Sequence, residues 1–96
     1  MPLIILFEDN EAHADQRQIH MKAHLAFLEA NSATIQAAGP LLEGGAGAGG
    51  LWLLSIDDAA VAQELVEADP FWPTGLRSRV RILTWRQVFA EGHRLS

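Results

Sequence analysis

The sequence has no cysteine, few basic residues and no long apolar run. Without cysteine, a disulfide framework and thiol chemistry are both excluded. No run of apolar residues approaches the roughly 20 that a membrane-spanning helix needs. The apolar start, residues 1–6, lacks a basic flank and leads directly into acidic residues, unlike a signal peptide. We therefore expect a cytoplasmic protein that does not contact a membrane.

Basic residues are too scarce to suggest a nucleic-acid partner. The 96 residues contain 7 Lys and Arg against 12 Asp and Glu, a formal net charge of −5. The charge is also uneven, because residues 1–70 contain 11 of the acids and residues 71–96 contain five of the bases. A net acidic chain is repelled by phosphates unless a basic face is well segregated, and five arginines are too few for that. We expect no nucleic-acid partner.

The length and the hydrophobic pattern predict one small domain, residues 1–96, of the α+β class. The predicted elements are a strand at 2–7, a helix at 15–31, strands at 34–42 and 51–56, a helix at 59–68 and a strand at 79–85. This order, βαββαβ, is typical of a ferredoxin-like subunit, in which both helices cover one face of an antiparallel sheet. The other face of that sheet is then not covered by a helix. We therefore expect a homodimer, in which a second copy packs on the open face.

Local signals add detail to the two predicted helices. Asp9 or Asp15 is a candidate N-cap of the first helix, and Asp57 or Asp58 of the second. In the first helix, Met21, Leu25 and Leu28 recur at helical spacing and are expected to face the core. His24 belongs to the neighbouring stripe, which places it at the border between core and solvent.

The glycine-rich segment 43–50 contains the pattern G-x-G-x-x-G from Gly45 to Gly50. In a dinucleotide site these glycines must follow a strand and open a helix, so that the helix N-terminus meets the pyrophosphate. Here the pattern precedes a predicted strand. It therefore favours a flexible hairpin loop, and we expect no cofactor.

Histidine spacing on the first helix raises the question of a metal site. His20 and His24 are four residues apart, with His13 nearby, and such spacing can place two imidazoles on one metal ion. No further ligand completes a set. We interpret these side chains as exposed or half-buried histidines and expect no metal.

The most informative stretch is the turn at residues 68–75, which carries two prolines, two large aromatic residues and Asp69 between a predicted helix and strand. An aspartate there is held by two rigid elements. A half-buried His24 with Asp69 as its partner could act as general acid or base near neutral pH. The alternative is that Asp69, directly before Pro70, only caps a short turn.

Other residues are candidates for binding a substrate. Phe71 and Trp72 could wall an apolar pocket, or simply plug the end of the fold. The Gly39-Pro40 break could leave backbone groups free beside the site, and Ser55 could supply a hydroxyl.

A row of arginines, Arg77, Arg79 and Arg81, recurs at period two on the last predicted strand. Guanidinium groups suit carboxylates, so the row could attract an anionic substrate. A solvated strand face, or an edge protected by charge, is the commoner use of such a row and the interpretation that we favour.

An ordered set of short segments resembles the YciI-like (YCII-related) family. The segments are residues 24–28, 38–41, 50–53, 68–71, 80–83 and 87–89. The resemblance spans nearly the whole chain, and it lies in the order of the segments rather than in any single motif. It implies a dimeric α+β barrel of ferredoxin-like subunits, related in fold to muconolactone isomerases and a chloromuconolactone dehalogenase.

The resemblance also implies an active site in which the histidine and aspartate of the family match His24 and Asp69. The first hypothesis is a small-molecule enzyme that acts on a small organic acid, lactone or related carbonyl compound by general acid–base chemistry. The alternatives are a non-catalytic domain that binds a ligand in the same cleft, and a structural dimer module. The sequence does not name the substrate.

Overall fold

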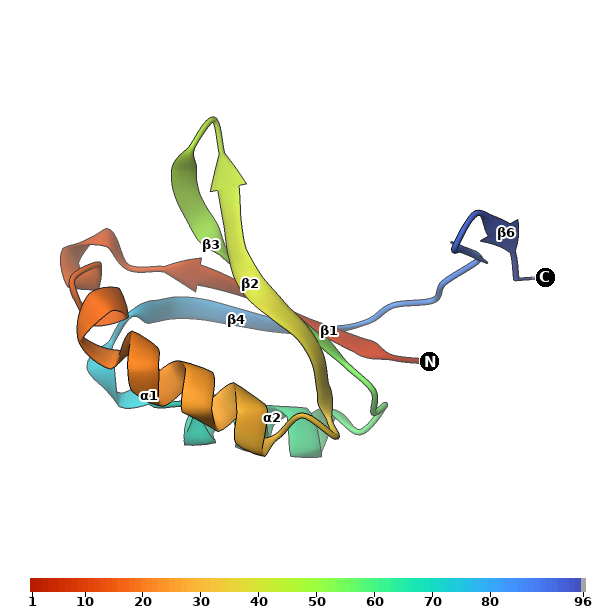
Figure 1. The fold of residues 1–96 in the computed structure, drawn as a ribbon, viewed down its shortest axis with the longest axis horizontal. Coiled ribbons are helices and arrows are strands. Elements are labelled where there is room, and N and C mark those ends of the chain that lie inside the picture. Colours follow the sequence, from red (N-terminus) through yellow and green to blue (C-terminus); the bar gives the residue numbers. More distant parts are fainter. Residues whose placement is uncertain (96) are drawn as a thin grey trace.

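A computed structural model describes residues 1–95, which form one four-stranded sheet, two α-helices and a small C-terminal hairpin (Figure 1). The elements are β1 (Leu3–Asp9), η1 (Glu11–His13), α1 (Gln16–Ala30), β2 (Ile35–Glu43), β3 (Ala46–Leu54), α2 (Ala59–Ala68), η2 (Trp72–Thr74), β4 (Arg77–Thr84), β5 (Phe89–Ala90) and β6 (His93–Arg94). The sheet order is β2-β3-β1-β4, and each neighbouring pair is antiparallel. Both helices lie on one side of the sheet (Figure 1). The predicted α+β, ferredoxin-like βαββαβ subunit is confirmed.

Helix α2 has the predicted bounds, because its two ends carry strong local signals. At its start the Asp58 carboxylate accepts hydrogen bonds from the backbone N–H groups of Ala60 (2.9 Å) and Val61 (3.3 Å). At its end Asp69 is extended and precedes Pro70, which disfavours a further helical turn. The helix packs Ala62 and Val66 against the sheet. It thereby places Asp69 at the edge of the core.

The core lies between the sheet and the helices. Alternate residues of β1 (Leu3, Ile5 and Phe7) are buried there, together with Trp52 and Leu54 of β3. The residues between them point to the opposite face of the sheet. That face carries five half-buried apolar side chains, Ile4, Leu6, Leu51, Leu53 and Leu83, and no helix formed by residues 1–95 covers it. The open apolar face predicted from the strand order is therefore present.

The prediction for the buried stripe of α1 holds for Leu28, which packs against the core, but is wrong for Met21 and Leu25. Met21 and Leu25 are 40% and 50% exposed, whereas His24 is only 7% exposed. A cavity lies beside this part of the helix, so Met21 and Leu25 line its edge instead of entering the core. His24 and Phe27, which lie on the neighbouring stripe of the helix, face the sheet.

The glycine-rich segment is mainly strand, which corrects the prediction of a flexible loop. Only Gly44 and Gly45 form the turn, with φ of 56° and 86°, and β3 begins at Ala46. The hairpin extends beyond β1, because β3 meets β1 only from Gly50 onward. We call the paired segments 38–43 and 46–50 the ribbon; it projects from the sheet in Figure 1. The G-x-G-x-x-G pattern therefore opens a strand, not a helix.

Strands β1 and β4 each extend two residues further than predicted, and their added ends meet. A register shift after Glu8 pairs Asp9 with Arg77. Asp9 therefore pairs with Arg77 across the two strands and does not cap α1. Asp15 occupies the N-cap position of α1 but makes no capping hydrogen bond with its side chain.

The C-terminal residues form a two-stranded hairpin, β5 and β6, set apart from the sheet (Figure 1). Among residues 1–95, no helix is long and apolar enough to cross a membrane.

Candidate active site

A cavity of about 200 Å³ lies between α1, the ribbon and the turn that follows α2. Most of its lining is apolar, and its charged groups come from α1 and from the paired ends of β1 and β4. The lining residues are Asp9, Arg17, Met21, His24, Leu25, Leu28, Ala38, Gly39, Pro40, Gly49, Gly50, Trp52, Phe71, Leu76 and Arg77. Its volume suits a single small organic molecule, because an apolar cavity of about 150 Å³ can hold benzene.

His24 and Asp69 form a buried pair at this cavity. The distance from His24 Nδ1 to Asp69 Oδ1 is 2.8 Å, and the two residues are 7% and 2% exposed. The His24 ring also stacks on Phe71, with ring centroids 4.3 Å apart and planes at 22°. A carboxylate facing Nδ1 assigns the proton of the neutral ring to Nδ1, which leaves the lone pair on Nε2. No hydrogen bond within residues 1–95 uses Nε2, so this atom is available to a molecule in the cavity.

Asp69 combines the two roles considered from the sequence. Its Oδ1 accepts a hydrogen bond from the Phe71 backbone N–H (3.1 Å) as well as contacting His24, so the carboxylate also stabilises the turn. Its Oδ2 lies 3.7 Å from Nη2 of Arg77. The carboxylate is thus held by the end of α2, by the turn that follows it and by Arg77 of β4, in addition to its contact with the imidazole.

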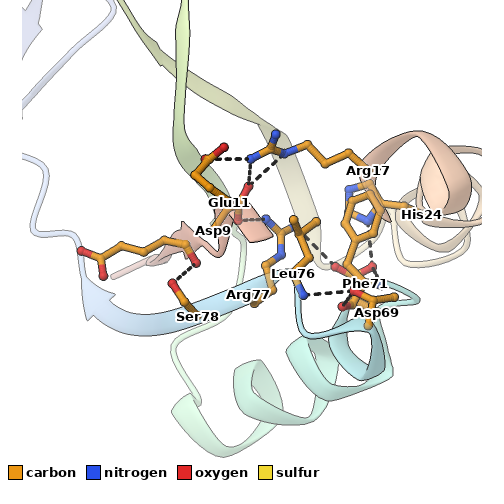
Figure 2. Close-up of polar contacts among 11 residues, drawn as sticks. Asp9, Glu11, Arg17, His24, Asp69, Phe71, Leu76, Arg77 and Ser78 are labelled. Carbon is orange, nitrogen blue, oxygen red and sulfur yellow. Dashed lines mark hydrogen bonds and ion pairs between the residues drawn. The ribbon is translucent and has the colours of Figure 1, made fainter. Parts of the chain in front are cut away.

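A chain of alternating charges continues from this pair to the cavity rim (Figure 2). Arg77 Nη1 donates to Asp9 Oδ1 (3.1 Å), and Arg17 donates to Asp9 Oδ2 from Nε (3.2 Å) and Nη2 (2.9 Å). The Arg77 guanidinium also lies 4.1 Å from the centre of the Phe7 ring. Because Arg77 lies between Asp9 and Asp69, it offsets part of the negative charge of both carboxylates, and Arg17 adds a second positive charge beside Asp9. Such compensation is what permits several charged groups to be buried together.

Asp9 and Arg17 were not predicted as site residues, and Arg77 lies in a different environment from the predicted one. The prediction of a solvated strand face holds for Arg79 and Arg81, which are exposed, but is wrong for Arg77, whose side chain is only 8% exposed. The reason is the register shift, which turns Arg77 toward Asp9. The signal in the sequence was an acid, Asp9, just after the first apolar strand, together with an arginine, Arg77, just before the last strand.

The other predicted site residues are divided between the cavity and the outside. Gly39, Pro40 and Phe71 line the cavity, whereas Trp72 and Ser55 do not. Ser55 Oγ instead donates to the backbone oxygens of Ala33 and Thr34. Pro40 is paired with Gly50 in the ribbon, so the Gly39-Pro40 step does not interrupt β2. Within residues 1–95, no group of three or more potential metal ligands is placed to hold an ion.

The comparison with protein families assigns the chain to a known group. The YCII-related domain matches residues 1–86. The chain belongs to the YCII-related family. The resemblance seen in the sequence is thereby confirmed. A search of curated proteins found no match for this YCII-related protein.

Two solved structures are similar to this YCII-related protein. The first is 5-chloro-2-hydroxyhydroquinone dehydrochlorinase (TftG) from Burkholderia phenoliruptrix AC1100, in complex with 2,5-dihydroxybenzoquinone. It is 28% identical, with a TM-score of 0.79 over 90% of this chain and 94% of that chain. The second is At3g17210 from Arabidopsis thaliana, 11% identical, with a TM-score of 0.49 over 94% of this chain and 97% of that chain. The similarity to TftG relates this family member to an enzyme that binds a small molecule.

Proposed function

We propose that this YCII-related protein is an enzyme in which His24 transfers protons to and from a small organic acid, lactone or related carbonyl compound. The observation that carries the proposal is the 2.8 Å contact between His24 Nδ1 and buried Asp69, made at the wall of a cavity. This contact orients the ring and leaves Nε2 for the substrate. The similarity to a dehydrochlorinase supports an enzyme of this kind.

In this mechanism Nε2 accepts a proton from the bound molecule and later returns it. Asp69 holds the imidazole in the required tautomer and stabilises the imidazolium that forms, without taking the proton itself. Stacking on Phe71 prevents the ring from turning. The apolar lining lowers the local dielectric, which strengthens the interaction between the imidazolium and Asp69.

Elimination of HCl from a chlorinated hydroxyquinol is a reaction that one such base can carry out. A hydroxyl proton is first moved through Nε2 to the ring carbon that bears chlorine, so that the hydroxyl becomes a carbonyl. A second hydroxyl then loses its proton to Nε2, and chloride leaves with the electron pair of the C–Cl bond. The products are a hydroxyquinone and HCl, and no oxidant is needed. We propose this reaction class because TftG bears the name of a dehydrochlorinase.

The function is tested by incubating the purified protein with 5-chloro-2-hydroxyhydroquinone without oxygen and measuring chloride by ion chromatography. We expect chloride release in proportion to enzyme concentration, above the rate without protein. A panel of lactones and hydroxylated ring acids, followed by mass spectrometry, extends the test. If no compound in either set is converted, the non-catalytic ligand-binding alternative replaces the proposed enzyme.

We further propose that residues 1–96 work as one domain, in the cytoplasm, and that two copies pack through their open sheet faces. The open face carries the five half-buried apolar side chains described above, and a domain of this size buries only roughly 60–65% of its unfolded surface alone. Sheet-to-sheet packing would remove these side chains from water.

Sedimentation velocity tests the dimer. We expect the wild-type protein to sediment as a dimer at micromolar concentration, and Leu53→Glu to sediment as a folded monomer, because it places a charge on the open face. Glu67→Lys on α2 is the control, since Glu67 is exposed on the other side of the sheet. A wild-type monomer at these concentrations would contradict the proposal.

A further inference from the structure

The wall of the cavity formed by the ribbon has almost no side chains. The ribbon contributes Ala38, Gly39, Pro40, Gly49 and Gly50 to the lining, so nothing larger than a proline ring projects from it. The facing helix α1 contributes long, flexible side chains, including Met21 and Leu25. A molecule in the cavity therefore lies against backbone on one side. Such a surface favours a flat molecule.

Arg17 is ion-paired with Asp9 and Glu11 but is the cavity cation that keeps an exposed edge with an unused nitrogen. Asp9 holds the guanidinium through Nε and Nη2, while no hydrogen bond within residues 1–95 uses Nη1. The side chain of Arg17 is 32% exposed, compared with 8% for Arg77, which is enclosed between Asp9 and Asp69. Across the rim, a Cβ added to Gly47 would lie about 4 Å from the guanidinium nitrogens of Arg17. Glycine at this position leaves the guanidinium edge open.

The charges around the cavity indicate which ligand the arginine would bind. Glu11 Oε1 also lies 3.7 Å from Arg17 Nη2, so with His24 neutral the two arginines face three carboxylates, those of Asp9, Glu11 and Asp69. When His24 takes a proton from a bound acid, this group gains one positive charge and the ligand becomes an anion. A guanidinium with free donors can then bind the ionised oxygen, preferably through two hydrogen bonds. Proton transfer and anion binding would support one another.

We propose that the cavity selects a flat organic acid of one substituted six-membered ring, with its ionised oxygen bound by Arg17 and its face against the ribbon. The inference rests on the proposed function, because it assigns a ligand class to the same cavity. It adds Arg17 and Gly50 as the residues that determine specificity.

The role of Arg17 is tested by calorimetric titration with 2,5-dihydroxybenzoquinone, an acidic ring, and with hydroquinone, a neutral ring of similar size. We expect the wild-type protein to bind the acid at least tenfold more tightly than hydroquinone. Arg17→Gln should weaken binding of the acid by roughly tenfold to a hundredfold, the usual effect of losing hydrogen bonds to a charged group. The affinity of Arg17→Lys for the acid should lie between those of the wild-type protein and Arg17→Gln, since lysine keeps the charge but not the planar donor geometry.

The matched control is Arg86→Gln, which removes the same charge from an exposed position after β4, outside the cavity, and should leave both affinities unchanged. Thermal midpoints of all variants establish that each is folded. Equal binding by wild type and Arg17→Gln, equal binding of the two rings, or no binding of the acid to the wild-type protein would each overturn the inference.

The flat wall is tested by Gly50→Ala. The added Cβ would lie 3.5 Å from Arg77 Nη1 and 3.5 Å from the Gly39 carbonyl oxygen, ordinary contact distances that preserve the fold. Because the methyl occupies space at the cavity wall, we expect at least tenfold weaker binding of 2,5-dihydroxybenzoquinone; unchanged binding would contradict this role of the wall.

The binding measurements on the Arg17 and Gly50 variants are independent of turnover. Binding that depends on Arg17 and Gly50 without any product would refute the proposed enzyme and preserve this inference. Turnover that is insensitive to Arg17 would support the enzyme and refute this inference.

Discussion

Replacing His24 by asparagine is expected to lower kcat by about 10²- to 10⁴-fold, the usual contribution of a general acid or base. Asparagine retains a polar group that can contact Asp69 Oδ1, so the buried carboxylate is not left without a partner. It has no atom that can accept and return a proton. Steady-state kinetics of the reaction found for the wild-type protein provide the measurement, and the thermal midpoint shows whether the fold is retained.

A control on the same helix separates loss of chemistry from a general effect on α1. His20→Asn makes the same change four residues earlier, at a half-buried position outside the cavity lining, and should leave kcat within about twofold. Asp69→Asn should lower kcat by about 10²-fold or more, because an amide no longer fixes the tautomer or stabilises the imidazolium. If His24→Asn kept more than a tenth of the wild-type kcat, His24 would not be the proton-transfer group.

Gly49→Ala is expected to cost about 3 kcal/mol or more of folding free energy, which places it among the most destabilising single substitutions. A Cβ at this position would lie 1.9 Å from the carbonyl oxygen of Phe7, and neither backbone segment is a flexible side chain that can move aside. In addition, Gly49 has φ of 101°, which side chains rarely adopt. Chemical denaturation followed by far-UV circular dichroism measures the loss.

Gly39→Ala provides the matched comparison, because a Cβ at that position meets no atom within 4 Å and the backbone is not left-handed. It should leave stability unchanged or raise it by about 0.5–1 kcal/mol, since alanine restricts the unfolded chain. If both substitutions had the same effect, the close approach between β1 and β3 at Gly49 would be wrong.

Element order was predictable from the sequence because each element carries local signals. The apolar run of β1, the Asp58 cap and the Asp69-Pro70 end of α2 do not depend on distant residues. His24 and Asp69 could be named as a pair because one lies at the border of a helical stripe and the other ends a helix. Their catalytic role stays a prediction.

The charged chain was not predictable, because it depends on register. Asp9 and Arg77 are 68 positions apart, and they meet only because the ladder shifts after Glu8. A shift of one residue moves a side chain to the other face of a sheet, and periodicity alone does not reveal it. The same limit explains the error on α1, where apolar spacing favoured Met21 and Leu25 as core residues. The cavity that leaves them exposed is formed by the ribbon, which is distant in sequence.

The placement of Trp52 gives the protein an internal optical reporter. Trp52 is 2% exposed and lines the cavity, and its ring centroid lies 6.4 Å from that of His24. Trp72 and Trp85 are exposed and lie outside the lining. Replacing these two by phenylalanine would leave one indole, whose emission responds both to an occupied cavity and to quenching by a protonated imidazole. A single fluorescence trace from that variant could follow ligand entry and proton transfer in real time, with no label attached.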